Sequence, residues 1–257
     1  MIALNRILQY YSMAEARHAR HILKEYLQYR ILDIVFSSKY GDRLIFMGGT
    51  CIRIVHGNDR FSEDIDLDNY DLNEADFADL MDVVKMELEK EGVGVEIRNS
   101  FHNVYHCYIK FPRILFDNKL SPLKDEKILI QIDSFQLKKK PETILKVLSK
   151  FDVFSEIKIY TPEVALSQKI CALIDRKRAK GRDIYDVVYL YSMTKPDWAY
   201  LKKYLKISGQ KELKEKLLNL FSAAELKKLA KDVAPFLIDA RKIIQVEKFN
   251  EWVATNL

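Results

Sequence analysis

A short segment near residue 65 alternates acidic and apolar residues strictly, and it constrains the fold more than any other part of the chain. It reads Glu63-Asp-Ile-Asp-Leu-Asp-Asn69. Successive side chains of a β-strand point to opposite faces of its sheet. The segment therefore predicts a half-buried strand, with Ile65 and Leu67 facing a core. The opposite face would carry the carboxylates of Asp64, Asp66 and Asp68.

The rest of the chain divides into two parts of different character. Apolar spacing and turn residues predict helices over 13–37, 50–56 and 73–91, and strands over 43–47, 63–69, 93–98, 104–111, 127–135 and 156–160. After Thr161-Pro162 the spacing is helical to the end, and proline suits the first turn of a helix. We expect an α+β fold: an α/β domain with an N-terminal helix over residues 1–160, then a helical domain over residues 161–257.

Carboxylates in this pattern favour metal-assisted chemistry. Asp64 and Asp66 lie two residues apart on one strand face, which lets them bind hard cations such as Mg²⁺. Two-metal phosphoryl transfer uses this kind of arrangement. Asp133 ends the apolar strand that begins at Lys127 and could supply a third carboxylate. The alternatives are a solvated strand face, and an aspartate at 133 that caps the next turn.

A glycine turn precedes the acidic strand. Gly48-Gly49-Thr50 follows the apolar run that ends at Met47 and opens a short helix. Such a turn lets the backbone approach a phosphate group, and the helix start adds N–H donors. The alternative is a tight turn without a ligand.

The two motifs together resemble a known family. Leu44-Ile-Phe-Met-Gly-Gly-Thr50 and Arg60-Phe-Ser-Glu-Asp-Ile-Asp-Leu-Asp68 are similar to the opening motif of the AbiEii/AbiGii-type nucleotidyltransferase toxins. These toxins belong to the DNA polymerase β-like nucleotidyltransferase superfamily. The resemblance implies a nucleotidyltransferase-type mixed sheet with flanking helices. It places the turn (Gly48, Gly49, Thr50) at the nucleotide phosphates and three carboxylates (Asp64, Asp66, Asp133) on Mg²⁺.

Ser62 precedes the carboxylate pair by two residues. In parts of the family the matching serine is a site of inactivating phosphorylation, and a phosphate beside Asp64 would repel a triphosphate. The alternative is a serine that satisfies a turn.

The helical half contributes a second motif. Lys169 lies at the edge of an apolar stripe, and a basic stretch follows from Arg176. From the residues alone, Lys169 could reach solvent and the basic stretch could be a charged loop. The toxin family has a lysine on one helix, a basic stretch, and then Arg-Asp-x-x-Asp. The positions that match are Lys169, Arg182, Asp183 and Asp186. The resemblance implies that Lys169 contacts the nucleotide, and that Asp183 or Asp186 orients it or acts as a general base.

We therefore expect a nucleotidyltransferase that moves a nucleoside monophosphate from an NTP to an acceptor. The resemblance implies a bacterial toxin of a toxin–antitoxin or abortive-infection system, the 3′ end of tRNA as the leading acceptor, and a cognate antitoxin as partner. A protein or small-molecule acceptor is the second possibility, and a non-catalytic nucleotide-binding regulator is the third.

Composition agrees with these expectations without selecting among them. The net charge is +5, which permits a polyanionic partner such as RNA. The three cysteines lie far apart and predict free thiols in a reducing cytoplasm. No apolar run of membrane-spanning length occurs, so no membrane partner is expected. His56, His102 and His106 have no metal-ligand spacing with the cysteines and are expected at the surface or in the core.

Overall fold

The chain passes between two structural units three times. The computed structural model describes residues 2–102 and 104–257. The first unit combines Met1–Cys51 with Phe61–Tyr160, and the second combines Ile52–Arg60 with Thr161–Leu257. Nine residues between the glycine turn and the acidic strand thus belong with the C-terminal helices. The sequence gives no signal for this excursion.

The described residues of the first unit form one seven-stranded mixed sheet, ordered β3-β4-β5-β2-β1-β7-β6. Two strand pairs, β1–β7 and β2–β5, are parallel, and the others are antiparallel. The α+β class expected from the sequence is confirmed. The strands are β1 Leu44–Met47, β2 Ile65–Tyr70, β3 Glu96–Phe101, β4 Tyr105–Phe111, β5 Ile128–Leu137, β6 Ile144–Lys150 and β7 Val153–Ile159.

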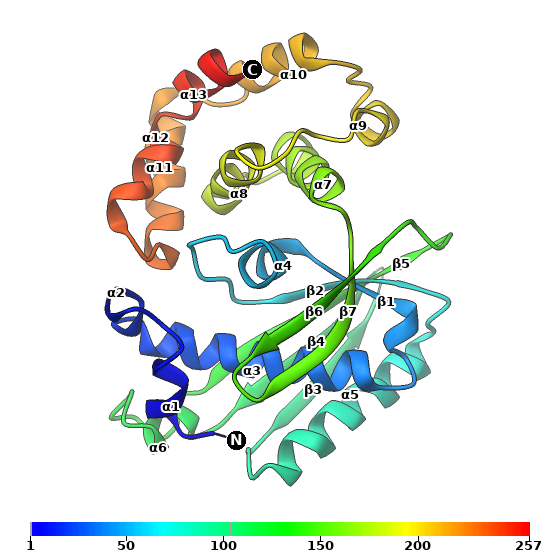
Figure 1. Ribbon diagram of the computed structural model, residues 1–257, viewed down its shortest axis with the longest axis vertical. Helices are drawn as coiled ribbons and strands as arrows, with labels where there is room; N and C mark the ends of the chain where they lie inside the picture. The colour runs from blue at the N-terminus through cyan, green and yellow to red at the C-terminus, as the bar shows by residue number, and fades with distance from the viewer. Residues whose placement is uncertain (1, 103) are drawn as a thin grey trace. The chain divides into compact units, whose positions relative to one another are not determined.

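Two long helices cover one face of this sheet (Figure 1). α3 packs on β7, and α5 packs on β3 and β4. The core between these layers contains Ile65 and Leu67, which are fully buried as the alternation predicted. The helices of this unit are α1 Leu4–Leu8, α2 Met13–Ala16, α3 Ala19–Ser37, α5 Glu74–Lys90 and α6 Ile114–Asp117, with a 3₁₀ turn at Gly41–Arg43. α4, Gly48–Ile54, contains the first crossing into the second unit.

The second unit is helical apart from its connections. Thr161 caps α7, where its side chain accepts from the amide of Val164, and Pro162 occupies the first turn. α7 packs on α8, and α8 packs on α11 and α12 (Figure 1). The helices are α7 Pro162–Asp175, α8 Gly181–Tyr191, α9 Trp198–Leu205, α10 Gln210–Leu218, α11 Ala223–Val233, α12 Ile244–Glu247 and α13 Phe249–Asn256.

Three strands differ most from the sequence-based expectation, and one of them, β7, begins at Val153 rather than at Glu156. β3 begins at Glu96 rather than at Val93, because the amide of Val93 donates to the Leu88 carbonyl at 3.1 Å and so completes the end of α5. β6 was not predicted at all. Within the described residues, no helix has both the length and the apolar character needed to cross a membrane.

Candidate functional site

The sheet places two of the predicted carboxylates next to each other. In the parallel pair β2–β5, Asp66 lies opposite Asp133. The antiparallel pairs extend this row to Met47 on β1 and His106 on β4. Partners in register share a face of the sheet, and this face is opposite to the one that Ile65 occupies in the core. The Asp66 and Asp133 side chains are therefore neighbours on the face away from α3 and α5.

The glycine turn packs directly against this row. Gly48 has a φ of +74°, a conformation that L side chains rarely adopt. A Cβ atom at residue 48 would also collide with Oδ2 of Asp66. Thr50 is fully buried, and its hydroxyl donates to the backbone carbonyl of Asp64. The turn is therefore fastened to the start of the acidic strand, with the backbone at Gly48 against the Asp66 carboxylate.

Two polar side chains hold Asp133. Nδ1 of His106 lies 2.7 Å from Oδ1 of Asp133, and Nε2 of Gln131 donates to the same oxygen at 2.7 Å. The Asp133 side chain is 23% exposed. Both contacts use one carboxylate oxygen, and among the described residues no hydrogen bond is found to the other. His106 was expected to be an ordinary surface or core histidine, and no spacing in the sequence pairs it with Asp133.

The third acid of the alternating strand has a different environment. Asp68 is buried, and the hydroxyl of Tyr160 donates to its Oδ2 at 2.5 Å. Burial raises the pKa of Asp68 above its usual value, while the hydrogen bond from Tyr160 opposes that shift. Ser62, ahead of the strand, is half-buried, and its carbonyl accepts from Nε2 of Gln28 at 3.2 Å.

The oxygen donors of this face fit a hard divalent cation that takes its remaining ligands from a substrate. In the part of the chain that the structure describes, no group of three or more His, Cys, Asp or Glu side chains converges on one metal position. Asp66 and Asp133 are the only two acidic residues that are partners in register among the described strands. Mg²⁺ is commonly bound by one or two carboxylates together with phosphate oxygens and water, so this donor set suits it.

In the second unit, Asp186 is the centre of a closed charge network. Arg60 donates to both of its oxygens, at 2.7 Å and 2.6 Å, and Asn58 donates at 2.9 Å. Nζ of Lys169 lies 2.9 Å from Oδ2 of Asp186, whose side chain is 0% exposed. Burial alone would raise the pKa of Asp186, but Arg60 and Lys169 outweigh it and hold that pKa below its usual value.

Lys169 joins Asp186 to Asp183. Its Nζ lies 3.2 Å from Oδ1 of Asp183, and the guanidinium of Arg176 pairs with the other oxygen of Asp183. Burial alone would lower the pKa of Lys169, but the carboxylates of Asp186 and Asp183 outweigh burial and raise it. Lys169 therefore remains an ammonium. Its side chain is 15% exposed.

Arg182, the fourth matched residue of this motif, lies over an aromatic ring. Its guanidinium lies 4.5 Å from the ring centre of Phe236, and the side chain is half-buried. The structure thus brings together Lys169, Asp183 and Asp186 in one unit, and Gly48, Asp66 and Asp133 in the other.

Arg60 and Asn58 are the site residues that sequence reasoning missed in the second unit. Arg60 is 2% exposed, although arginine is rarely buried without a partner. It lies 126 positions from Asp186 along the chain. Its place at the start of the acidic motif was the available signal.

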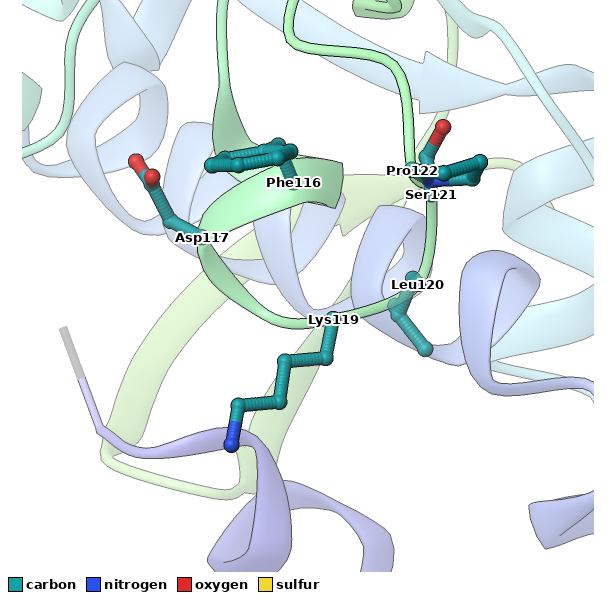
Figure 2. A pocket seen from close by; sticks show the side chains of 6 residues that line it. All are labelled: Phe116, Asp117, Lys119, Leu120, Ser121 and Pro122. Atoms are coloured by element: carbon teal, nitrogen blue, oxygen red, sulfur yellow. The ribbon is translucent and has the colours of Figure 1, made fainter.

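The cavity nearest α6 is not a candidate for this chemistry. It has a volume of about 670 Å³ and is lined by Phe116, Asp117, Lys119, Leu120, Ser121 and Pro122. Figure 2 shows the Asp117 carboxylate and the Lys119 ammonium pointing in different directions. With one acid and one lysine that diverge, the cavity offers neither a paired carboxylate nor a phosphate clamp.

Comparison with known proteins identifies the family and the fold. The family model described as nucleotidyl transferase AbiEii toxin, type IV TA system, matches residues 30–254. The crystal structure of JHP933 from Helicobacter pylori is similar, with a TM-score of 0.55 at 15% identity over 93% of both chains. So is that of a candidate nucleotidyltransferase from H. pylori, with a TM-score of 0.56 at 15% identity over 93% of this chain and 96% of the other. At this identity the two likenesses establish the fold. No curated protein sequence matches the chain.

The fold and the family match define the class of the protein: it is a nucleotidyltransferase. The match covers most of the chain, which therefore belongs to the AbiEii nucleotidyl transferase toxin family of type IV toxin–antitoxin systems. Membership implies a nucleotide substrate and an antitoxin partner.

Proposed function

We propose that this protein transfers a nucleoside monophosphate from an NTP to the 3′ end of an RNA, with tRNA as the first candidate, in a reaction that requires Mg²⁺. The observation that carries the proposal is the register of β2 with β5, which makes Asp66 and Asp133 neighbours. In the reaction, the acceptor hydroxyl releases its proton to water and its oxygen bonds to the α-phosphorus, while the bond from that phosphorus to the leaving pyrophosphate breaks.

The carboxylates of Asp64, Asp66 and Asp133 would hold Mg²⁺. When bound, Mg²⁺ supplies Lewis-acid stabilisation of the phosphate charge and lowers the pKa of the attacking hydroxyl. His106 and Gln131 would keep one oxygen of Asp133 occupied and so fix the direction of the other. The backbone at Gly48 and Gly49 would approach the phosphates, and Thr50 would hold that turn on the strand.

Lys169 would supply a positive charge to the triphosphate. Its side chain is 15% exposed, and its ammonium stays charged because two carboxylates pair with it, as a phosphate contact requires. We assign Asp186 the task of positioning Lys169. A fully buried carboxylate with a lowered pKa and three donor residues is a poor proton acceptor, which argues against a general base at 186. Asp183 shares the positioning through its contacts with Lys169 and Arg176. Arg182 would add a second cation toward the nucleotide.

Ser62 is a proposed point of regulation. A phosphate on its hydroxyl, two residues before Asp64, would place negative charge where the NTP brings its own. The intact mass of the protein co-expressed with its antitoxin tests this idea. A gain of one phosphate that disappears in Ser62→Ala supports it, and an unmodified mass removes it.

Labelling tests the function. The purified protein is incubated with Mg²⁺, total tRNA and each α-labelled NTP in turn, beside an Asp64→Ala control. We expect label in tRNA with the wild type only, and the productive NTP names the nucleotide. No label in tRNA would overturn the RNA acceptor and direct the search to proteins and small molecules. Label that survives Asp64→Ala would place the metal site on another strand.

A further inference from the structure

A second cavity, of about 470 Å³, lies wholly within the second unit. It is formed by the loop before α8 together with α11, and its volume falls in the range of pockets that bind small molecules. Of the segments that line it, only the basic stretch that begins at Arg176 was identified from the sequence. The lining residues are Arg176, Arg178, Ala179, Lys180, Arg182, Phe221, Glu225, Lys228, Leu229 and Asp232.

The cavity has an excess of positive charge. Five of its lining side chains are cationic and two are acidic. Both acids already accept hydrogen bonds from backbone amides: Glu225 from Ser222 at 2.8 Å as a helix cap, and Asp232 from Gly181 at 3.1 Å. Three of the cations have no carboxylate partner among the described residues. These are Arg178, Lys180 and Lys228.

Apolar and planar groups lie beside these charges. Phe221 and Leu229 contribute to the lining, and the guanidinium of Arg182 is stacked on the ring of Phe236 at 4.5 Å. A nucleotide unit combines the two features that such a lining recognises, a phosphate and a flat base.

The cavity shares one residue with the lysine cluster. Arg176 lines the cavity and pairs with Asp183, and Asp183 is 3.2 Å from Nζ of Lys169. A ligand in the cavity would therefore lie in the same unit as Lys169, the residue proposed to hold the triphosphate. This continuity favours a ligand that takes part in the same reaction.

We propose that this cavity binds one nucleotide unit of the acceptor RNA, with the phosphate on Arg178, Lys180 and Lys228 and the base against Phe221 and Leu229. The inference deepens the proposed function, since it rests on RNA being the acceptor. A nucleotide unit can come from a strand or from a free nucleoside monophosphate, and the two sources share the chemistry recognised.

Binding of a fluorescein-labelled single-stranded RNA, followed by anisotropy without NTP, tests the cavity separately from catalysis. Lys228→Glu is compared with Lys227→Glu, an identical charge change on the opposite side of α11 from the lining positions. We expect Lys228→Glu to weaken binding about tenfold and Lys227→Glu less than about twofold, since each lost phosphate contact weakens binding on that order. Arg178→Glu should behave like Lys228→Glu.

Equal binding by the two lysine variants would overturn the proposed pocket, even if the wild type labels tRNA. A pocket that binds RNA while no NTP labels any RNA would leave the pocket standing and overturn the proposed function instead. Unlabelled adenosine monophosphate as a competitor separates the sources: displacement at concentrations near those of the RNA identifies a free nucleotide, and its absence identifies the strand.

Discussion

The two groups of aspartates in this protein are built in opposite ways. Asp186 is fully buried and accepts hydrogen bonds or ion pairs from Arg60, Asn58 and Lys169. Asp133 keeps about a quarter of its side chain exposed, and its contacts with His106 and Gln131 both use one oxygen. A carboxylate that must bind a ligand needs accessible lone pairs, whereas one that positions a neighbour needs all of its lone pairs committed.

The difference gives each group a separate expected signature. Changes among the partly exposed carboxylates of the sheet should affect the reaction more than the fold. Changes in the buried network of the second unit should affect the fold first, because a charge left there without its partner is costly.

The largest effect is expected from Asp66→Asn. The amide keeps the size of the side chain and removes its charge, so we expect transfer activity to fall about a thousandfold, which corresponds to about 4 kcal/mol of transition-state stabilisation. The urea midpoint of unfolding should change little. Activity within tenfold of the wild type would show that Asp66 does not act in the reaction.

The next effect is on stability. Asp186→Asn leaves the Arg60 and Lys169 charges buried without their shared partner, and it should lower the free energy of unfolding by about 3–5 kcal/mol. Urea denaturation measures it. Glu251→Gln, which breaks the exposed pair with Lys248, is the control and should cost less than about 1 kcal/mol. Similar losses in the two variants would contradict the closed network.

Gly48→Ala should lower both stability and transfer activity. Gly48 and Gly92 both have positive φ, at +74° and +78°, but a Cβ at 92 meets nothing within 4 Å, whereas one at 48 meets Asp66. Both alanine variants should lose about 1 kcal/mol of stability from the backbone conformation. Only Gly48→Ala should also lose activity, by at least about tenfold, because the Asp66 carboxylate must move. Equal activity in the two variants would show that the glycine turn has no role in the reaction.

His106→Ala tests the support of Asp133. Losing a hydrogen bond to a metal-binding carboxylate typically costs about 10- to 100-fold in metal affinity, and we expect the Mg²⁺ concentration for half-maximal transfer to rise by a factor in that range. His102→Ala, an exposed histidine near the same strand, should leave that concentration unchanged. An unchanged Mg²⁺ dependence in His106→Ala would show that His106 does not support Asp133 in metal binding.

The smallest effect concerns pH. The pKa of Asp186 is lower in the folded protein than its ordinary value of about 3.9 in the unfolded chain. The unfolded state therefore takes up this proton first as the pH falls. The stability that the Asp186 carboxylate contributes is fully present above about pH 5. It is lost at lower pH, as the pH falls toward the pKa of Asp186 in the folded protein. The difference in unfolding free energy between wild type and Asp186→Asn should be constant from pH 6 to 8 and shrink below about pH 4.

Local signals made several elements predictable. Strict alternation predicted β2, and Pro162 marked the first turn of α7. β6 lacked such a signal. Its hairpin with β7 turns through Phe151 and Asp152 rather than through glycine or asparagine. Phe151 has a φ of +60°, and its ring packs on the rings of Tyr26 and Tyr29. Tertiary packing therefore replaces the usual turn chemistry.

The contacts of the candidate site were less predictable than its residues. Asp66 and Asp133 meet only because β2 pairs with β5, and no local pattern determines which strands are neighbours. Arg60 and Asp186 meet only because residues 52–60 join the second unit. Residue types with a chemical task can be read from the sequence, but their partners depend on contacts distant along the chain.

Binding of Mn²⁺, followed by electron paramagnetic resonance with and without a non-hydrolysable NTP analogue, tests the carboxylate row most directly. Mn²⁺ accepts the same oxygen ligands as Mg²⁺. We predict that the wild type binds Mn²⁺ more tightly when the analogue is present, and that Asp66→Asn loses at least about tenfold in that affinity while its fold is retained. Equal affinity in the two proteins would contradict a metal site on β2 and β5.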